Sequence, residues 1–345
     1  MESRPRSSRS PATAVAEARA TLERDRRGFG RAAELYRSLE LPYQEARCLL
    51  EAGDPAEFVF LPHFKAVPNA DTAASLQSQV CPLVQGETYY LQAAFRGELE
   101  ELKRRGVRLL RPLLDLSRGV EHAAASLLET ARAMGFDTRR AKQAFAAALE
   151  AQQGFFRAMR EAGDRLLREL AADPARFAVV LFGRPYSAYA SEANKGIPHK
   201  FASRGIAVLP LDALDLTSER AKRHMYWGMG KLILKAARLT ERHPQLFGAY
   251  ITNFSCGPDS FVITYFRDIL GRKPSLTLEL DSHTADAGLE TRIEAFLDIV
   301  RAYRHLAARR GIVRRASAFT PARTLLDEAG ARVVKIGRAS CRERV

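Results

Sequence analysis

Cys256 is the residue whose setting most favours chemistry. It lies in the segment NFSCGPDS, residues 253–260, between an apolar run and a helical pattern that Pro258 can start. A cysteine at a helix start meets the positive end of the helix dipole, which lowers the pKa of the thiol and favours the thiolate. Such a thiolate would serve as a nucleophile or a metal ligand. The alternative is a small buried cysteine in a tight turn.

Cys81 has a similar setting, because Pro82 follows it and proline suits the first turn of a helix. The alternative is again a core cysteine. Two helix-start thiolates facing each other across a cleft are too few for a four-ligand metal site. No CxxC motif is present, which excludes a zinc ribbon and a thioredoxin motif. We interpret Cys48 as structural, since it falls on a helical pattern.

Three further side chains cluster at the end of a predicted strand and could do acid/base work. Glu279, Asp281 and His283 cluster in the segment LELDSHTADAG, residues 278–288. Carboxylates and imidazoles at a strand end are candidates for proton transfer. The alternative is turn formation and helix capping by the same residues. They are therefore weak catalytic candidates.

A polar loop after another predicted strand could hold an anionic ligand. Its candidate ligand-binding residues are Arg184, Tyr186, Asn194, Lys195 and His199. Phosphate or a carboxylate would suit such donors. The glycine spacing fits neither a Walker A loop nor GxGxxG, and no GxSxG elbow occurs. No nucleotide signature is therefore present, and a serine hydrolase is weakly supported.

The elements that must position these residues alternate between strand and helix. An apolar run at 58–62 predicts a strand, a polar loop covers 63–80, and a helix begins at Cys81. Two helices are predicted within 117–172, separated near 134–137. Alternation then predicts a parallel sheet, whose ligands would lie at the carboxyl ends of its strands. The predicted strands are 177–182, 206–211, 247–252 and 275–280, and the predicted helices are 217–242, 260–270 and 286–309.

Composition bounds the class of protein. The chain has 345 residues, 46% of them hydrophobic and 27% charged, which is typical of globular domains. No apolar run of about 18 residues or secretory signal occurs, so we expect a cytoplasmic protein without a membrane partner. The net charge is +14, but 44 of the 54 basic residues are arginines spread along helical patterns. We therefore do not expect nucleic acid as a partner.

Several segments together resemble one family. This family is the domain associated with CoA-substrate-specific enzyme activases, which is similar to components of 2-hydroxyacyl-CoA dehydratases of the 2-hydroxyglutaryl-CoA type. The resemblance spans about residues 57–310. The segments that carry it are FVFLPHF at 58–64, CPLVQGETYYLQAAF at 81–95, GRPYSAYASEANKGIPHKFASRGIAVLPLD at 183–212, HMYWGMGKLILKAAR at 224–238, FGAYITNFSCGPDSF at 247–261 and GRKPSLTLELDSHTADAG at 271–288.

The resemblance implies an α/β fold of two Rossmann-like lobes with parallel sheets plus helical additions. We expect a partial first lobe over 55–116, a helical connection over 117–174 and a second lobe over 175–311. The segment 1–54 is helical and is either tetratricopeptide-like or joined by misassembly. A tail covers 312–345. Its last part, residues 336–345, resembles translated sequencing-adapter read-through, so we interpret the chain as a fragment.

The resemblance also implies chemistry. Related dehydratase components hold an iron–sulfur cluster through cysteines, which makes Cys81 and Cys256 the expected ligands of a 4Fe-4S cluster. A third cysteine in relatives lies upstream, where this chain has no matching context. An ATP-hydrolysing activase would be the partner, with ATP bound there only, and an acyl-CoA would be the ligand.

Two functions remain open from the sequence. The first is an oxygen-sensitive iron–sulfur component of an ATP-activated 2-hydroxyacyl-CoA dehydratase or reductase system, suited to anaerobic metabolism. If the chain is an enzyme, it is thus a lyase or reductase component. The alternative is a non-catalytic α/β binding or scaffold domain that accompanies the activase.

Overall fold

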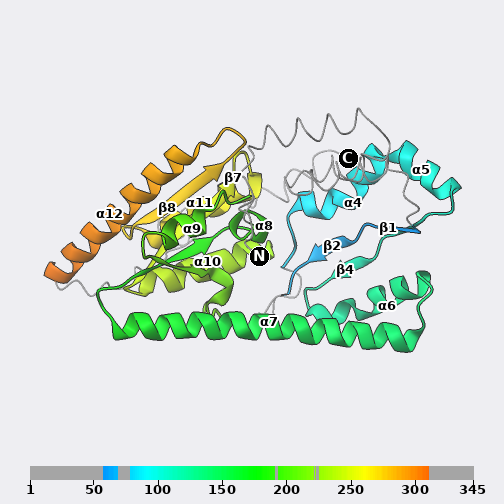
Figure 1. Ribbon diagram of the computed structural model, residues 1–345, viewed down its shortest axis with the longest axis horizontal. Helices are drawn as coiled ribbons and strands as arrows, with labels where there is room; N and C mark the ends of the chain where they lie inside the picture. Colours follow the sequence, from blue (N-terminus) through cyan, green and yellow to red (C-terminus); the bar gives the residue numbers. More distant parts are fainter. Residues whose placement is uncertain (1–56, 69–77, 191–192, 221, 223–224, 311–345) are drawn as a thin grey trace, which may run out of the picture. The chain divides into compact units, whose positions relative to one another are not determined.

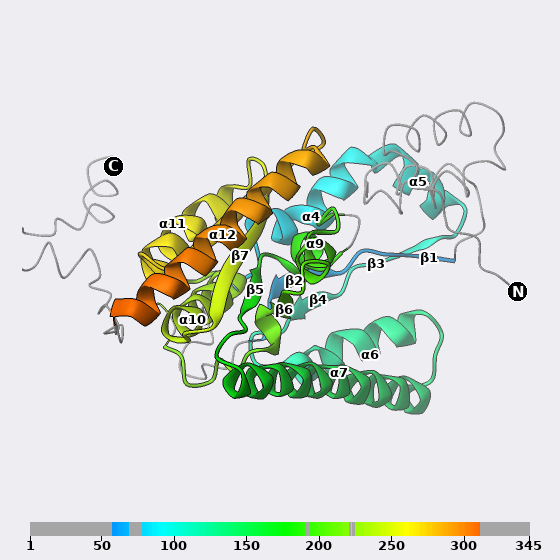
Figure 2. The same ribbon diagram turned by 60° about the vertical axis from the view of Figure 1, so that its left-hand side comes forward.

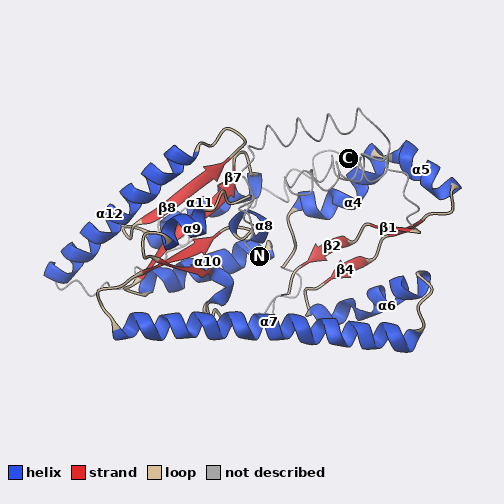
Figure 3. Ribbon diagram, viewed as in Figure 1, coloured by secondary structure: helices blue, strands red, loops and turns tan. Residues whose placement is uncertain are grey.

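The computed structural model describes residues 57–68, 78–190, 193–220, 222 and 225–310 (Figure 1). The predicted N-terminal segment 1–54, Cys48 and the tail 312–345 lie outside the described residues. Within them the chain is α/β with parallel sheets, as predicted (Figure 3). None of the described helices is both long enough and apolar enough to cross a membrane.

A four-stranded parallel sheet forms the larger sheet of the described chain, with strand order β6-β5-β7-β8. The central strands β5 and β7 are almost wholly buried, as expected for a parallel sheet covered on both faces. All four strands were predicted to within two residues at either end. They span Ala178–Phe182 (β5), Ala207–Pro210 (β6), Leu246–Asn253 (β7) and Ser275–Leu280 (β8).

Helices lie on both faces of this sheet (Figure 2). On one face, Phe182 and Tyr250 pack edge-on against Phe266 of α11, with ring centroids 4.8 and 5.3 Å away. On the other face, Phe201 of α9 meets Phe296 of α12. The helices are Pro185–Ala188 (α8), Ile197–Ala202 (α9), Gly228–Arg242 (α10), Gly257–Leu270 (α11) and Asp286–Arg310 (α12), with a 3-10 turn Leu211–Ala213 (η3).

The helix predicted to start at residue 217 begins only at Gly228. The preceding backbone is extended because it pairs with Gln79, whose N–H donates to the carbonyl of Tyr226 at 2.9 Å. The Gly228 N–H donates back to the carbonyl of Gln79 at 2.9 Å. Tertiary hydrogen bonds therefore replace the helical ones that the local pattern favoured.

The smaller sheets lie near the N-terminal end of the described chain. Strands β1 and β3 pair in parallel, and so do β2 and β4. The pairing offset is the same from Phe58 opposite Arg108 to Phe64 opposite Leu114, so the two sheets continue one ladder. Pro62 and Pro112 interrupt it, because proline has no N–H to donate. The strands are Phe58–Phe60 (β1), His63–Ala66 (β2), Arg108–Leu110 (β3) and Leu113–Asp115 (β4).

The sequence prediction was incomplete here. The strand predicted at 58–62 is confirmed in its first three residues, but part of the predicted loop after it is strand β2. Strands β3 and β4 were not predicted, since each has only three residues. Two helices cover this part of the chain, Pro82–Ala94 (α4) and Arg96–Arg104 (α5).

The two helices predicted within 117–172 are confirmed. They are Ala124–Ala133 (α6), preceded by the 3-10 turn Val120–Ala123 (η2), and Thr138–Ala172 (α7). Gly135 adopts a φ of +91°, which ends α6. The carboxylate of Asp137 then accepts a hydrogen bond from the Arg140 N–H at 2.9 Å and caps α7.

Helix α7 packs on the four-stranded sheet region through a glycine. A Cβ added at Gly163 would overlap the carbonyl oxygen of Ala213 in η3, whereas one at Gly154 would meet only the Arg157 guanidinium at 3.8 Å. We expect Gly163→Ala to lower the free energy of unfolding by about 1–3 kcal/mol through overpacking. Gly154→Ala, the matched control, should raise it by about 0.5–1 kcal/mol. Urea denaturation measures both, and equal effects would contradict this packing.

An ion pair between β2 and β4 should make the stability of the protein depend on pH. Lys65 Nζ lies 2.8 Å from Asp115 Oδ2, and hydrogen bonds from Lys65 and Ser117 lower the pKa of Asp115 to about 2. Because the folded pKa lies below the ordinary 3.8, the pair stabilises the protein above that pH and loses its effect as the pH falls towards 2.

We therefore expect Asp115→Asn to cost less than about 1 kcal/mol at neutral pH, since the pair is partly exposed. The difference between parent and variant should shrink as denaturation is repeated at decreasing pH, down to about pH 2.5. A difference that stayed constant over this range would show that the carboxylate charge is not responsible.

Candidate functional site

The candidate site is built at the carboxyl ends of β5 and β7, the central strands of the larger sheet. Arg184 follows β5 directly after Gly183, whose φ is +145°. A Cβ at Gly183 would lie 2.6 Å from the carbonyl oxygen of Ile251, so only glycine lets the chain turn this close to β7. The close approach of Gly183 to β7 therefore places Arg184 near the end of that strand.

Cys256 follows β7 and is the N-cap residue of α11, as predicted. The turn between them uses Ser255 in the left-handed region, with a φ of +63°. Pro258 lies in the first turn of the helix, and the side chain of Cys256 is half-buried. The loop thus places a thiol at the sheet edge where ligands of parallel sheets bind.

Cys81 is the N-cap residue of α4 and is 3% exposed. Its predicted helix start is confirmed. Two residues before it, Gln79 pairs with the backbone around Trp227, as described above. The Trp227 ring lies 5.7 Å from the guanidinium carbon of Arg184. The pairing therefore brings Cys81 into the neighbourhood of Arg184.

Arg184 is the centre of the site. It is 8% exposed, donates from Nη2 to the sulfur of Cys256, and lies 3.5 Å from Asp259 Oδ2. Although burial works against it, Asp259 raises the pKa of Arg184, and Tyr186, Cys256 and Cys81 add to that effect. Cys256 thus contacts the guanidinium directly, and Cys81 lies near enough for its ionised form to raise the same pKa. Nε of Arg184 has no hydrogen-bond partner within the described part of the chain.

Tyr186 covers this group from the outside. Its ring lies 5.2 Å from the guanidinium carbon of Arg184, and its side chain is 43% exposed. Burial of the hydroxyl raises the pKa of Tyr186 to about 12, against the opposing effect of Arg184. Cys256 and Cys81 both contribute to the raised value, which again groups the two thiols. The phenol therefore stays protonated at neutral pH.

Asp259 is a site residue that was not among the candidates drawn from the sequence. It is 1% exposed, and its carboxylate accepts hydrogen bonds from Thr252 Oγ1 and, at 3.3 Å, from Tyr250 Oη. Burial first, and then Asp259, raise the pKa of Tyr250 well above its ordinary value. Both donors therefore stay protonated and hold the carboxylate towards Arg184.

The thiol of Cys256 differs from the prediction. We expected the helix dipole to lower its pKa, but burial raises it, and the charge of Asp259 adds to the increase. The backbone N–H of Asp259 and the charge of Arg184 work in the opposite direction without reversing it. In this structure the neutral thiol is therefore favoured over a reactive thiolate.

Some residues of the polar loop 183–200 face the site, and others stabilise the loop through hydrogen bonds. The Asn194 amide donates to the carbonyl of Ala188 at 3.0 Å and accepts from the Gly196 N–H at 2.9 Å. Lys195, with a φ of +50°, donates to the carbonyl of Thr284 at 2.9 Å. Of the predicted ligand-binding residues, Arg184 and Tyr186 thus lie together, whereas Asn194 and Lys195 contact the loop and its neighbours.

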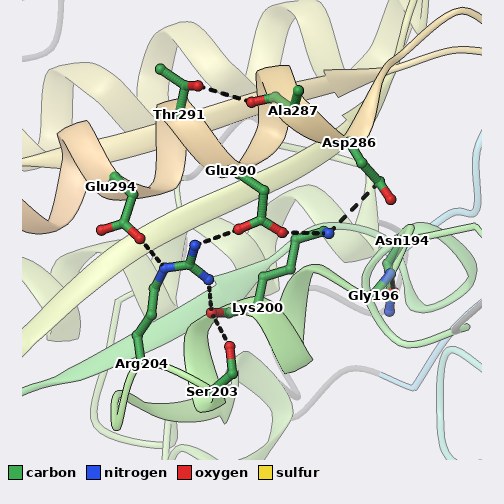
Figure 4. A network of polar contacts seen from close by, with 10 residues as sticks. All are labelled: Asn194, Gly196, Lys200, Ser203, Arg204, Asp286, Ala287, Glu290, Thr291 and Glu294. Atoms are coloured by element: carbon green, nitrogen blue, oxygen red, sulfur yellow. Dashed lines mark hydrogen bonds and ion pairs between the residues drawn. The ribbon is translucent and has the colours of Figure 1, made fainter.

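A charged network fixes the end of the same loop (Figure 4). His199 is exposed on α9, and the next residue, Lys200, lies 2.7 Å from Glu290 Oε1 and 3.7 Å from Asp286 Oδ1. Arg204 pairs with Glu290 and Glu294 of α12. These contacts join α9 to α12 and leave His199 outside the Arg184 group.

The predicted acid/base candidates lie at the end of β8. Asp281 Oδ1 accepts from the His283 N–H at 2.9 Å and from Thr284 Oγ1 at 2.7 Å, and these bonds, that of Thr284 first, lower the pKa of Asp281. The side chain of His283 is 91% exposed, and Glu279 is exposed on β8. These are turn contacts, and a catalytic role for the three residues stays a prediction.

A second buried carboxyl was also missed. Asp212 follows β6, and burial raises its pKa. Burial and then Asp212 raise the pKa of Tyr189 far above its ordinary value. Hydrophobic neighbours in the sequence give a weak hint of this burial, but the effect of Asp212 on the pKa of Tyr189 is a product of the fold.

Among the described residues, the cysteine donors available to a metal are two thiols. Within the described residues, no group of three or more histidine, cysteine, aspartate or glutamate side chains is arranged to hold a metal ion. Cys81 and Cys256 are free, and Cys48 lies outside the described residues. Any further ligand must therefore come from elsewhere.

Substitution of Asp259 tests whether buried Arg184 depends on this carboxylate as its counter-charge. Asp259→Ala would leave a buried guanidinium without its counter-charge, so we expect a loss of about 3–5 kcal/mol in the free energy of unfolding. Asp281→Ala, in an exposed turn, should have a much smaller effect. Chemical denaturation compares the two, and similar losses would show that Arg184 does not depend on Asp259.

The comparisons with known proteins give one match. Residues 46–214 match the family model described as the CoA enzyme activase uncharacterised domain. The matched range includes Cys81 and Arg184 and ends before Cys256. No curated protein and no solved structure matches the chain.

Proposed function

Because residues 46–214 belong to the CoA enzyme activase uncharacterised domain, we propose that the chain is an iron–sulfur component of an ATP-activated 2-hydroxyacyl-CoA dehydratase or reductase system. The observation that carries the proposal is the convergence of two thiols on one guanidinium. Cys81 and Cys256 come from distant parts of the sequence, and each begins a helix. Cys256 contacts Arg184, and the charge of Cys81, when ionised, also raises the pKa of Arg184.

The chemistry of the donor set fits part of a cluster site. Iron–sulfur clusters are held by cysteine thiolates, and hydrogen bonds to the sulfurs tune them. Arg184 already donates to the sulfur of Cys256, and its positive charge would offset that of thiolate ligands. A 4Fe-4S cluster commonly takes four cysteines, so Cys81 and Cys256 would supply two ligands.

The chain's own residues would do three things at this site. Asp259 holds Arg184 in place, and Arg184 holds the sulfur of Cys256. The nearly complete burial of Cys81 excludes water from one side. A bound cluster would supply one-electron transfer, and an ATP-hydrolysing activase partner would supply the electron.

An acyl-CoA would approach through the exposed side of the group. Tyr186 is the exposed residue there, and it lies over the Arg184 guanidinium. The Arg184 guanidinium behind the protonated Tyr186 hydroxyl could together bind an anionic or carbonyl oxygen of such a ligand.

The proposed fold is two Rossmann-like lobes. The four-stranded parallel sheet with helices on both faces supports it.

The alternative function is a non-catalytic α/β binding or scaffold domain that accompanies the activase. A specific observation favours it, since the described residues supply only two cysteines and no third metal-binding side chain beside them. The contact of Arg184 with Cys256 would then be structural, and the thiol would stay protonated.

Metal loading separates the two functions. After anaerobic reconstitution of the full chain with iron and sulfide, we expect stoichiometric iron and sulfide with the electron paramagnetic resonance signal of a reduced cluster. Cys81→Ser and Cys256→Ser should each lose most of the iron, because each removes a ligand. Cys48→Ser tests the cysteine outside the described residues as a further ligand.

Cys341→Ser is the control, because this cysteine lies in the predicted adapter-derived tail and should keep the parent's iron content. Iron that survives both the Cys81 and Cys256 substitutions would exclude the proposed ligands. A parent chain that binds no iron while remaining folded by circular dichroism would favour the scaffold function.

A further inference from the structure

A pocket of about 620 Å³ lies beside the turn that joins α5 to β3. We call it the basic pocket, because its charged lining consists of Lys103, Arg108 and Arg111. No acidic side chain of the described residues lines it. Gln92 of α4 adds an amide, and the other lining residues are glycine, alanine and branched aliphatic residues. The volume is in the range of pockets that bind small molecules.

A neutral partner positions the guanidinium of Arg111. Its Nη1 donates to Gln92 Oε1, while Gln92 Nε2 donates to the carbonyl of Thr88 at 2.6 Å. Thr88 is 4% exposed, and its Oγ1 donates to the carbonyl of Pro62 at 3.1 Å. The amide of Gln92 is therefore held at both ends, and it fixes the guanidinium without neutralising its charge.

Arg108 is also positioned without a counter-charge. It lies opposite Phe58 of β1 in the strand register, and its guanidinium carbon is 4.6 Å from the centre of the Phe58 ring. Among the described residues, neither Arg108 nor Arg111 forms an ion pair with a carboxylate. Arg104, in the same basic run of residues 103–111, pairs with Glu101 at 2.5 Å. The two arginines of the basic pocket thus keep their charge available to a ligand.

A smaller hollow of about 290 Å³ adjoins the basic pocket, since Gln92, Lys103 and Leu109 line both. Tyr89 lines the smaller hollow and is 63% exposed. An exposed aromatic ring offers a stacking surface for a heteroaromatic base. Cations and a stacking surface therefore adjoin each other, as the two ends of a nucleotide require.

We propose that the basic pocket binds the phosphate groups of a nucleotide-type ligand, with Arg108 and Arg111 as the principal contacts. The planar guanidinium matches two phosphate oxygens at once. Lys103 joins them, because its exposed pair with Glu100, at 2.6 Å, is weak and can be exchanged for a phosphate. The ring of Tyr89 takes the base in the adjoining hollow.

The basic pocket is separate from the Arg184 group. Cys81 begins α4 and Gln92 lies near its end, so about 16 Å separate them along the helix at 1.5 Å per residue. Binding of a phosphorylated ligand therefore does not depend on the proposed cluster, and it can be measured without iron. The basic pocket lies wholly within the matched residues 46–214. Both CoA and free nucleotides carry a diphosphate on a nucleoside, so the chemistry of the pocket fits either source.

Isothermal titration calorimetry of the full chain tests the proposal with inorganic diphosphate, ADP and CoA as probes. Arg108→Met and Arg111→Met should each weaken ADP binding about tenfold, because each removes a charge-assisted contact but keeps an apolar stem. Tyr89→Ala should weaken the binding of ADP and leave that of inorganic diphosphate unchanged. Arg104→Met is the matched control, since it removes the same charge from the same basic run outside the pocket, and it should leave every affinity unchanged.

Comparison of CoA with ADP identifies the source of the phosphate groups. Tighter binding of CoA would identify its phosphorylated end as the ligand, whereas tighter binding of ADP would identify a free nucleotide. Either result supports the basic pocket as a phosphate site when Arg111→Met weakens the binding.

Two results would overturn the proposal. The first is the absence of binding of all three probes to a chain that circular dichroism shows to be folded. The second is an equal loss of affinity in Arg104→Met and Arg111→Met, which would show that the probes respond only to the net charge of +14. If Arg108→Met fails to fold because its contact with Phe58 is lost, Arg111→Met decides alone, since Arg111 is exposed.

Discussion

The buried pair of Arg184 and Asp259 is the constraint on which the site depends. A guanidinium at the carboxyl end of a parallel sheet cannot stay charged and buried without a counter-charge. Asp259 provides it from the first turn of α11, and its own position is held by Thr252 and Tyr250 of β7. The pair therefore joins β5, β7 and α11 at the point where Cys256 emerges.

A second constraint joins the Cys81 region to the larger sheet. The two hydrogen bonds between Gln79 and the backbone around Trp227 involve no side chain. They hold 225–227 extended, so that α10 starts at Gly228, and they bring Trp227 towards Arg184.

How far each element could be predicted depends on the range of the forces that form it. Strands β5, β7 and β8 are apolar runs bounded by turn residues, and α11 begins at a proline, so local pattern located them. Strands β2 to β4 are three or four residues long and exist because of tertiary pairing, β2 with β4 and β3 with β1. The predicted start of α10 was wrong for the same reason, since the pairing of the backbone around Trp227 with Gln79 replaced the local helical preference.

The sequence by itself determined the α/β class and the helix starts at Cys81 and Cys256, because these depend on residues close together in the chain. It also carries the match of residues 46–214 to the family model. Only the tertiary structure decided that Cys256 contacts Arg184, that Cys81 lies near it and that Asp259 lies beside it. It also decided the direction of the pKa shift of Cys256. A helix dipole can be read from local sequence, whereas burial and a neighbouring carboxylate are set by residues that meet only when the chain has folded.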